Sequence, residues 1–435
     1  MDVSDLIMIS VDDHIVEPPE MYDNHLTQAQ KAFAPKFVKE ANGTDFWVYE
    51  GRRVSAGGLN AVAGRPREEY GMEPSSIDHA RPGVRNIHAR IDDMNVNGIL
   101  ASVNFPSTVT FDGSGFMLYE NKDHALQLVR AYNDWHVDEW CGAYPGRNIP
   151  LGILPFWDVP ATVEEIKRLA RKGCHAITFS DNPSVKGLPS IHDAHWDPMW
   201  KACAENETVI CIHIGSGASA PHASPASPID AWITTMPISI VNSTADWVYL
   251  SALQKYPNLK IVLSEGGIGW IPYFLERADF THEHHSAWTH SPLGKKKPSE
   301  VFREHFITCF IDDKFGLANL DWIGEDIVTY ECDYPHSDTL WPYAPERLFE
   351  TINHLSPEKI AKVTHLNAMR TFNFDPFAIL GRENCTVGAL RAKATHVDTS
   401  PQSYGGLSPL KAGEAPRPVT SADIQGMFLK KEEAA

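Results

Sequence analysis

The stretch Leu6–Pro19, LIMISVDDHIVEPP, is an apolar run that ends in Asp12, Asp13 and His14 and stops at two prolines. Successive side chains of a strand point to opposite faces, so Asp12 and His14 point the same way and Asp13 points the other way. A carboxylate and an imidazole that converge at the end of a buried strand provide half of a metal site. The stretch therefore predicts a strand that ends in candidate metal ligands.

Three later apolar runs end in the same manner: TVICIH reaches His213, KIVLSEGG contains Glu265, and IVTYECDYPH contains Asp333. Singly, each residue is a weak signal, because a strand-end histidine is often a satisfied core residue and an aspartate often caps a turn. As a set, two carboxylates and two imidazoles predict one bound divalent ion, for which Zn²⁺ is the first choice and Mn²⁺ or Fe²⁺ are alternatives. The predicted metal ligands are Asp12, His14, His213 and Asp333.

The chain as a whole alternates strand-like and helix-like segments. Such a pattern forms a parallel sheet, either closed into a barrel or open and doubly wound. An open sheet usually has a Gly-rich phosphate turn after its first strand, where this chain has Asp-Asp-His. We therefore predict an α/β fold of the (β/α)8 TIM-barrel type. The eight predicted strands are 6–12, 99–104, 149–154, 175–180, 208–213, 260–265, 306–311 and 327–332, and the predicted helices are 87–97, 121–141, 160–172, 195–206, 240–256, 268–284 and 344–355.

Three regions exceed a minimal barrel. We predict a single barrel domain over residues 1–383, with a long insert over about 21–86 after the first strand, and a C-terminal extension over 384–435. The insert is rich in Gly, Pro and charge, and is a candidate lid or extra subdomain over the barrel mouth. The Gly/Ser/Pro/Ala-rich loop 215–237 follows His213 and should border the site.

The formal net charge of −18 argues against nucleic acid or an anionic membrane as a partner. The N-terminus does not resemble a secretory signal, and no apolar segment approaches the about 18–20 residues that span a bilayer. The seven cysteines are scattered without a C-x-x-C pair, which argues against a disulfide framework. We expect a cytoplasmic enzyme that acts on a small molecule. Barrels of this kind often pair through their loops, which leaves a homodimer open.

Three further polar residues lie near the predicted ligands in the sequence. Glu17 follows His14 by three residues, and could bond the backbone, support a ligand histidine or form an ordinary salt bridge. His336 and Asp338 share the turn after Asp333, where they could orient a ligand or contact substrate, or could be solvated.

Four segments resemble the amidohydrolase-related group that includes aminocarboxymuconate-semialdehyde decarboxylase and the resorcylate-type decarboxylases. They are VDDH at 11–14, CIHIG at 211–215, LSEGGIGW at 263–270 and CDYPH at 332–336, and LNAMRTFNF at 366–374 is also similar. The resemblance implies a ligand pair at Asp12 and His14, a ligand at His213, and a residue that is both ligand and proton-transfer group at Asp333. The group has His-Gly-Gly on its sixth strand, whereas this chain has Glu265 followed by two glycines.

The glutamate at position 265, where the group has a histidine, affects which reaction the site can catalyse. With Asp12, Asp333 and Glu265 ionised, three negative charges surround one divalent cation, so a carboxylate substrate is repelled unless loop cations compensate or Glu265 is protonated. Glu265 is suited to general acid–base catalysis on a neutral carbonyl compound. The sequence thus favours a metal-dependent hydrolase of an amide, lactone or related C–N or C–O bond in a small cyclic or aromatic compound, with Asp333 and Glu265 catalytic. The alternatives are a metal-dependent non-oxidative decarboxylase of an aromatic or unsaturated acid, and a non-catalytic metal-binding barrel.

Overall fold

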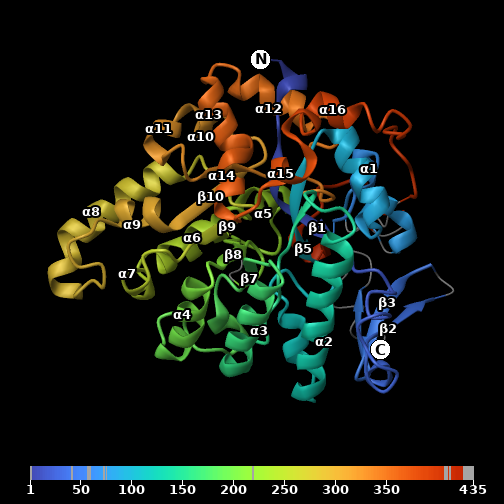
Figure 1. Ribbon diagram of the computed structural model, residues 1–435, viewed down its shortest axis with the longest axis horizontal. Coiled ribbons are helices and arrows are strands. Elements are labelled where there is room, and N and C mark those ends of the chain that lie inside the picture. The colour runs from blue at the N-terminus through green and yellow to red at the C-terminus, as the bar shows by residue number, and fades with distance from the viewer. Residues whose placement is uncertain are drawn as a thin grey trace.

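The computed structural model of the protein describes residues 2–40, 43–55, 60–71, 74, 76–217, 220–405, 410 and 413–424. Its main sheet has eight parallel strands in the order β6-β5-β1-β11-β10-β9-β8-β7 (Figure 1). All eight predicted strands are present. They are β1 (Ile9–Ile15), β5 (Ala101–Pro106), β6 (Asn148–Ile149), β7 (Ala176–Phe179), β8 (Val209–His213), β9 (Ile261–Ser264), β10 (Phe306–Phe310) and β11 (Val328–Tyr330).

The two ends of this strand order meet through Gly152, just after β6. The N–H of Gly152 donates to the carbonyl of Ala176, and its own carbonyl accepts from the N–H of Thr178, both at 2.9 Å. The sheet is therefore closed, and the predicted (β/α)8 barrel is confirmed. The third strand is shorter than the predicted 149–154, because Pro150 has no N–H to donate to a neighbouring strand.

The first strand lies three residues later than predicted. Its last residues pair with β5, with Asp13 opposite Asn104 and Ile15 opposite Pro106. Because this pairing continues beyond Asp12, both Asp12 and His14 lie within β1, and the strand alternation places them on one side.

Helices cover the outside of the barrel (Figure 1). Every predicted helical segment contains a helix, although 240–256 is divided into two and 121–141 ends in a π-helical turn over Trp135–Cys141. The helices are α1 (Ile87–Asn97), α2 (Lys122–Asp134), α3 (Val159–Arg171), α4 (Asp197–Glu205), α5 (Ile229–Thr235), α6 (Ile238–Trp247), α7 (Ala252–Lys255), α8 (Ile271–Thr289), α9 (Pro298–His305), α10 (Lys314–Ala318), α11 (Leu320–Ile323), α12 (Ala344–Ile352), α13 (Pro357–Ala361), α14 (Asn367–Thr371), α15 (Pro376–Leu380) and α16 (Val387–Arg391).

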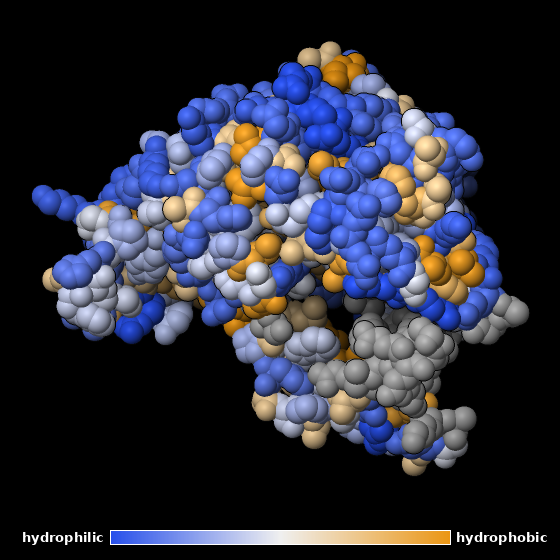
Figure 2. Space-filling model, turned by 90° about the horizontal axis from the view of Figure 1, so that it is seen from below, coloured by the Kyte–Doolittle hydropathy of each residue, from blue (hydrophilic) through white to orange (hydrophobic). Residues whose placement is uncertain are grey.

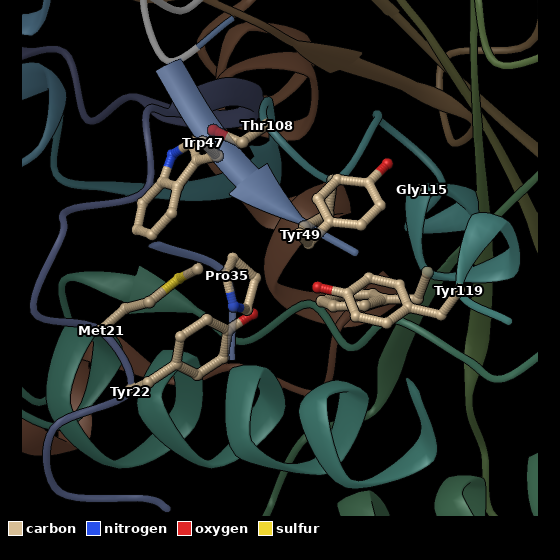
Figure 3. Close-up of a pocket in the computed structure, with 10 residues that line it drawn as sticks. Met21, Tyr22, Pro35, Trp47, Tyr49, Thr108, Gly115 and Tyr119 are labelled. Carbon is tan, nitrogen blue, oxygen red and sulfur yellow. The ribbon is translucent and has the colours of Figure 1, made fainter. Parts of the chain in front are cut away.

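The long insert contains a small antiparallel sheet in the order β2 (Lys36–Lys39), β3 (Asp45–Tyr49) and β4 (Arg52–Ser55). Trp47 on β3 is only 2% exposed. It lines a small cavity of about 30 Å³ together with Tyr22, Tyr49 and Tyr119, where the insert meets the loop after β5. Figure 3 shows these side chains around the cavity. The insert is thus attached to the barrel by an aromatic contact.

The chain after α16 contacts the two irregular regions beside the barrel mouth. The N–H of Gln402 donates to the carbonyl of Gly64 in the insert (2.8 Å), and the N–H of Ser421 donates to the carbonyl of Ser227 in the 215–237 loop (3.1 Å). The extension therefore connects both regions, whereas its predicted boundary at residue 384 stays a prediction.

The surface seen in Figure 2 is mainly hydrophilic, with apolar patches separated by polar side chains. Among the described residues, no helix combines the length and the apolar composition that crossing a membrane requires.

Candidate metal centre

The predicted ligands lie at one end of the barrel. Asp12 and His14 are on β1, His213 ends β8, and Asp333 follows β11 by three residues. Glu265 comes directly after β9. Because the carboxyl ends of parallel barrel strands share one rim, side chains far apart in the sequence meet there. Asp12, His14, His213 and Asp333 are each 0% exposed.

The donor atoms approach one another closely around His14. Its Nε2 lies 3.5 Å from Asp12 Oδ1, 3.4 Å from Asp333 Oδ1 and 3.2 Å from His213 Nε2. His213 Nε2 in turn lies 3.4 Å from Asp12 Oδ2 and 3.2 Å from Glu265 Oε2. Ligands held about 2.0–2.2 Å from one ion at angles of about 90–109° are about 2.8–3.6 Å apart. The spacing is therefore that of atoms that share a cation.

Two overlapping sets of side chains have donor atoms that all lie within 4.8 Å of one another. Each set contains His14, and the four predicted ligands are distributed over both. The first set is Asp12, His14 and His213, and the second is His14, Glu265, Asp333 and His336.

Several of these donor atoms have no hydrogen-bond partner among the described residues. Both carboxylate oxygens of Asp12 and both of Asp333 are buried and have no hydrogen-bond partner. Burying a carboxylate without a partner is costly, so native structures seldom leave one in this state. His213 Nδ1 lies 2.6 Å from the carbonyl of Ile214, which fixes the ring with Nε2 towards the cluster. The donor set thus fits a divalent metal ion.

The electrostatics of the cluster support this interpretation. Burial, together with the carboxylates of Glu331 and Glu265, raises the pKa of Asp12 well above its usual range. Burial likewise raises the pKa of Asp333 and lowers that of His213 to about 3. The cluster by itself therefore disfavours charge, and a bound cation would reverse that preference for the carboxylates.

Two of the strand-end residues have left-handed backbone conformations, with φ of 61° at Glu265 and 53° at Asp333. Such conformations cost non-glycine residues about 1–3 kcal/mol and persist only where neighbouring groups hold them. The N–H of Glu265 donates to Glu331 Oε2 at 3.0 Å, and the N–H of Asp333 donates to the carbonyl of Asp12 at 2.8 Å. Both turns are therefore fixed from within the barrel.

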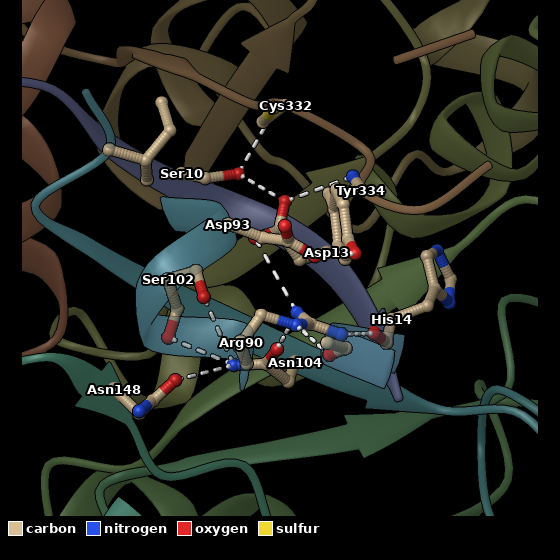
Figure 4. Close-up of polar contacts among 12 residues, drawn as sticks. Ser10, Asp13, His14, Arg90, Asp93, Ser102, Asn104, Asn148, Cys332 and Tyr334 are labelled. Carbon is tan, nitrogen blue, oxygen red and sulfur yellow. Dashed lines mark hydrogen bonds and ion pairs between the residues drawn. The ribbon is translucent and has the colours of Figure 1, made fainter. Parts of the chain in front are cut away.

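Asp13, on the opposite side of β1, belongs to a buried polar network with Arg90 of α1 (Figure 4). Asp13 Oδ1 accepts from Ser10 Oγ at 2.9 Å and from the N–H of Tyr334 at 3.1 Å. Arg90 Nη1 lies 3.9 Å from Asp13 Oδ2, and Nη2 donates to the carbonyl of His14. The network joins the two segments that carry His14 and Asp333.

Glu17 accepts the N–H groups of Ser107 (3.1 Å) and Thr108 (2.8 Å), so it holds the loop after β5 and bonds backbone rather than a histidine. That loop places the ring of Phe111 4.5 Å from the ring of His213 and 4.9 Å from that of His14. Glu17 therefore shapes the apolar wall of the cluster.

His336 lies in the cluster, whereas Asp338 is exposed and belongs to neither ligand set. The His336 ring stacks on His14 at 3.8 Å, and its Nδ1 lies 2.9 Å from Asp333 Oδ1.

The sequence interpretation missed Glu331, whose Oε2 also accepts from Cys309 Sγ at 2.5 Å. Burial raises the pKa of Glu331 to about 7. Glu331 directly follows β11 and precedes Asp333 by two residues, so its place between an apolar run and a predicted ligand was the signal for it.

The barrel and the cluster at its rim define the class of the protein, a TIM-barrel enzyme with the donor set of a divalent-metal site. The amidohydrolase family model matches residues 76–374. The chain belongs to this family, as the sequence resemblance implied. The comparison with curated proteins gave no match.

Solved structures with the same fold include the amidohydrolase map2389c from Mycobacterium avium subsp. paratuberculosis K-10, with a TM-score of 0.62, 19% identity, and 84% of this chain and 99% of that chain covered. The 5-carboxyvanillate decarboxylase LigW from Sphingomonas paucimobilis has a TM-score of 0.57 and 18% identity, with 85% and 100% covered. A 5-carboxyvanillate decarboxylase from Novosphingobium aromaticivorans, with bound manganese and 3-methoxy-4-hydroxy-5-nitrobenzoic acid, has a TM-score of 0.59 and 18% identity, with 84% and 97% covered.

Proposed function

We propose that the protein is a metal-dependent non-oxidative decarboxylase of an aromatic or unsaturated carboxylic acid. The observation that carries this proposal is the buried cluster of imidazoles and unpartnered carboxylates at the barrel rim. Decarboxylases of a hydroxylated aromatic acid share its fold, one of them with bound manganese. These comparisons favour decarboxylation over the hydrolysis that the sequence alone favoured.

Asp12, His14, His213 and Asp333 would hold the divalent ion, with Zn²⁺ or Mn²⁺ as the candidates. When bound, the ion supplies positive charge that attracts the substrate carboxylate and a neighbouring oxygen. In decarboxylation the bond between the ring carbon and the carboxylate breaks, carbon dioxide leaves, and the electron pair stays on the ring carbon. Asp333 would deliver the proton that this carbon takes up, which is the role that the sequence resemblance implied for it. Both of its carboxylate oxygens are buried without a hydrogen-bond partner, so one could bind the ion while the other holds the proton.

The surroundings of the cluster suit an aromatic substrate. Phe111 packs against the rings of His14 and His213 and forms an apolar wall beside the ligand atoms. Such a wall excludes water and offers a flat face to a planar ring.

Hydrolysis remains the second candidate, because Glu265 stands 3.2 Å from His213 and could assist attack on a neutral carbonyl. The two reactions are separated by their products. We expect carbon dioxide release from a panel of hydroxylated benzoates that includes 5-carboxyvanillate, and no turnover of anilides or aryl lactones.

Asp333→Asn should reduce turnover at least 100-fold and leave the circular dichroism spectrum unchanged, because the barrel core is built from other residues. Asp321→Asn, a change on an exposed side chain, is the matched control. In D₂O the wild-type product should carry one deuterium at the carbon that lost the carboxylate. Turnover of the amides or lactones without carbon dioxide release would replace this proposal with the hydrolase.

A further inference from the structure

A groove of about 340 Å³ lies at the end of the barrel opposite to the metal cluster. Arg147 lines this groove and directly precedes β6. Its side chain donates to the carbonyls of Ile99 and Leu100, which precede β5. The groove is therefore at the N-terminal ends of the strands, away from the rim where the catalytic groups of such barrels lie. Volumes of about 300–1,000 Å³ are typical of small-molecule sites.

Two parts of the chain form the walls of the groove. One is the segment 142–147 before β6, and the other comprises α15, α16 and the start of the C-terminal extension. The walls approach closely at Gly146, where an added Cβ would lie 3.3 Å from Leu380 Cγ and 3.5 Å from Ile379 Cβ. The apolar lining includes the aliphatic side chains of Ile379, Leu380 and Leu390. Because Ile379 is 56% exposed, a ligand in the groove would remove apolar surface from water.

Arg147 is a buried cation without a counterion. It is 6% exposed, and no carboxylate in the described part of the chain forms an ion pair with it. Its Nε and Nη2 atoms donate to backbone carbonyls, whereas Nη1 makes no hydrogen bond with any described residue. Buried charges are normally paired, because a charge that leaves water needs an opposite charge or hydrogen bonds in return. The free end of this guanidinium therefore indicates an anionic ligand.

Further positive charge lies beside the same groove. Lys393 is exposed, lines the groove and forms no ion pair with the described residues. Burial raises the pKa of the Cys385 thiol, whereas the nearby charges of Lys393 and Arg147 lower it. Arg382 and Glu383 act on the same thiol in opposite directions. Three cations and one carboxylate thus lie together here, in a chain whose formal net charge is −18.

We propose that this groove binds a small aliphatic carboxylate. The carboxylate would accept from Nη1 of Arg147 and from the ammonium of Lys393, because both cations favour an oxyanion. The aliphatic part would pack against Ile379, Leu380 and Leu390, which offer apolar burial and no aromatic face for a planar ring. Since the groove and the metal cluster are at opposite ends of the barrel, this ligand is distinct from the substrate and the inference does not depend on the proposed function.

Isothermal titration calorimetry with octanoate tests the inference. The metal-loaded, full-length protein is titrated with octanoate, acetate, inorganic phosphate and octyltrimethylammonium. We expect one octanoate site per chain. Acetate, which lacks the aliphatic chain, and octyltrimethylammonium, which lacks the carboxylate, should each bind at least about 10-fold more weakly. Inorganic phosphate that binds as tightly as octanoate would overturn the proposed class of ligand.

Substitutions of exposed side chains locate the octanoate site. Lys393→Glu and Ile379→Asp should each weaken octanoate binding by about 10-fold or more, because the first reverses an attracting charge and the second places a charge against the aliphatic chain. Lys295→Glu, the same change at another exposed lysine, is the matched control and should keep the wild-type affinity.

Circular dichroism and an unchanged metal content verify that these variants fold with an intact cluster. Wild-type octanoate affinity in either Lys393→Glu or Ile379→Asp would overturn the inference, because octanoate would then bind elsewhere. The absence of saturable binding to the wild type, or an equal loss of affinity in Lys295→Glu, would overturn it as well.

Discussion

Replacing Arg90 by methionine should weaken both the fold and the metal site, because this buried side chain supports the end of β1. Its guanidinium donates to the carbonyl of Gly83 at 2.6 Å, to Asn104 Oδ1 at 2.7 Å and to the carbonyl of His14. Arg90 is 0% exposed. Methionine fills a similar volume, so the variant removes donors and charge without leaving a large cavity.

The size of the loss in stability depends on the groups that stay buried after Arg90 is replaced. Asp13 stays buried without its cation, and removing one partner of a buried ion pair costs about 3–5 kcal/mol. Burial raises the pKa of Asp13 to about 6 even with Arg90 present, so without Arg90 the carboxyl has to remain a lone charge or take up a proton. We expect the free energy of unfolding to fall by about 3–5 kcal/mol at neutral pH. Adding Asp13→Asn removes the lone charge and should recover about 1–3 kcal/mol.

A double-mutant cycle on the metal-free protein, followed by tryptophan fluorescence in urea, measures this coupling. Mn²⁺ affinity is measured on the same four proteins, and we expect Arg90→Met to lower it about 10–100-fold, because support of a ligand segment is lost. Arg147→Met is the matched control. Arg147 is also buried and donates to the carbonyls of Leu100 (2.5 Å) and Ile99 (3.2 Å), away from the ligand segments. Additive stability changes, or unchanged Mn²⁺ affinity in Arg90→Met, would refute the reasoning.

Three further predictions concern the ligands, pH and the insert. His213→Ala should bind one metal equivalent fewer than the wild type, and unchanged stoichiometry would remove His213 from the ligand set. Metal affinity should fall as the pH is lowered, because the raised pKa values of Asp12 and Asp333 let both carboxyls hold protons that the metal must displace. His213, with a pKa of about 3, stays neutral over this range. Calorimetry in two buffers of different ionisation enthalpy should show net proton release, and a metal affinity that is constant between about pH 5.5 and 8 would contradict this. Trp47→Ala should lower the free energy of unfolding, measured in urea titrations, by about 3–5 kcal/mol, because Trp47 is buried in the insert. The metal content should stay constant, since Trp47 is far from the ligands in sequence. A loss of metal would show that the insert also supports the cluster.

The eight strands and the rim cluster were predictable because each depends on local sequence. A short apolar run predicts a buried parallel strand, and a polar residue at its end predicts a side chain at the barrel mouth. His213 and Asp333 could be placed together in this way without knowing any distance. Glu331 was within reach of the same reasoning, because it is a polar residue that directly follows the apolar run of β11.

The features that the sequence did not give depend on contacts between distant segments. The insert sheet was missed, although DFWVY at Asp45–Tyr49 alternates in the manner of a strand, because its partners lie in a region dominated by turn residues. Arg90 lies on a helix where an arginine is normally expected to be solvated. Only the fold brings its guanidinium to the carbonyl of His14 and to Asp13.

The choice between hydrolysis and decarboxylation depends on the charge of Glu265. The preference for hydrolysis assumed that Asp12, Asp333 and Glu265 are all ionised beside one divalent ion, which gives a site that repels a carboxylate. No lysine or arginine in the described part of the chain forms an ion pair with these three carboxylates. Burial and the neighbouring Asp333 raise the pKa of Glu265 well above its usual range, so this carboxyl takes up a proton more readily than an exposed one. A protonated Glu265 removes the excess negative charge, and the glutamate that replaces the group's histidine then no longer excludes a carboxylate substrate.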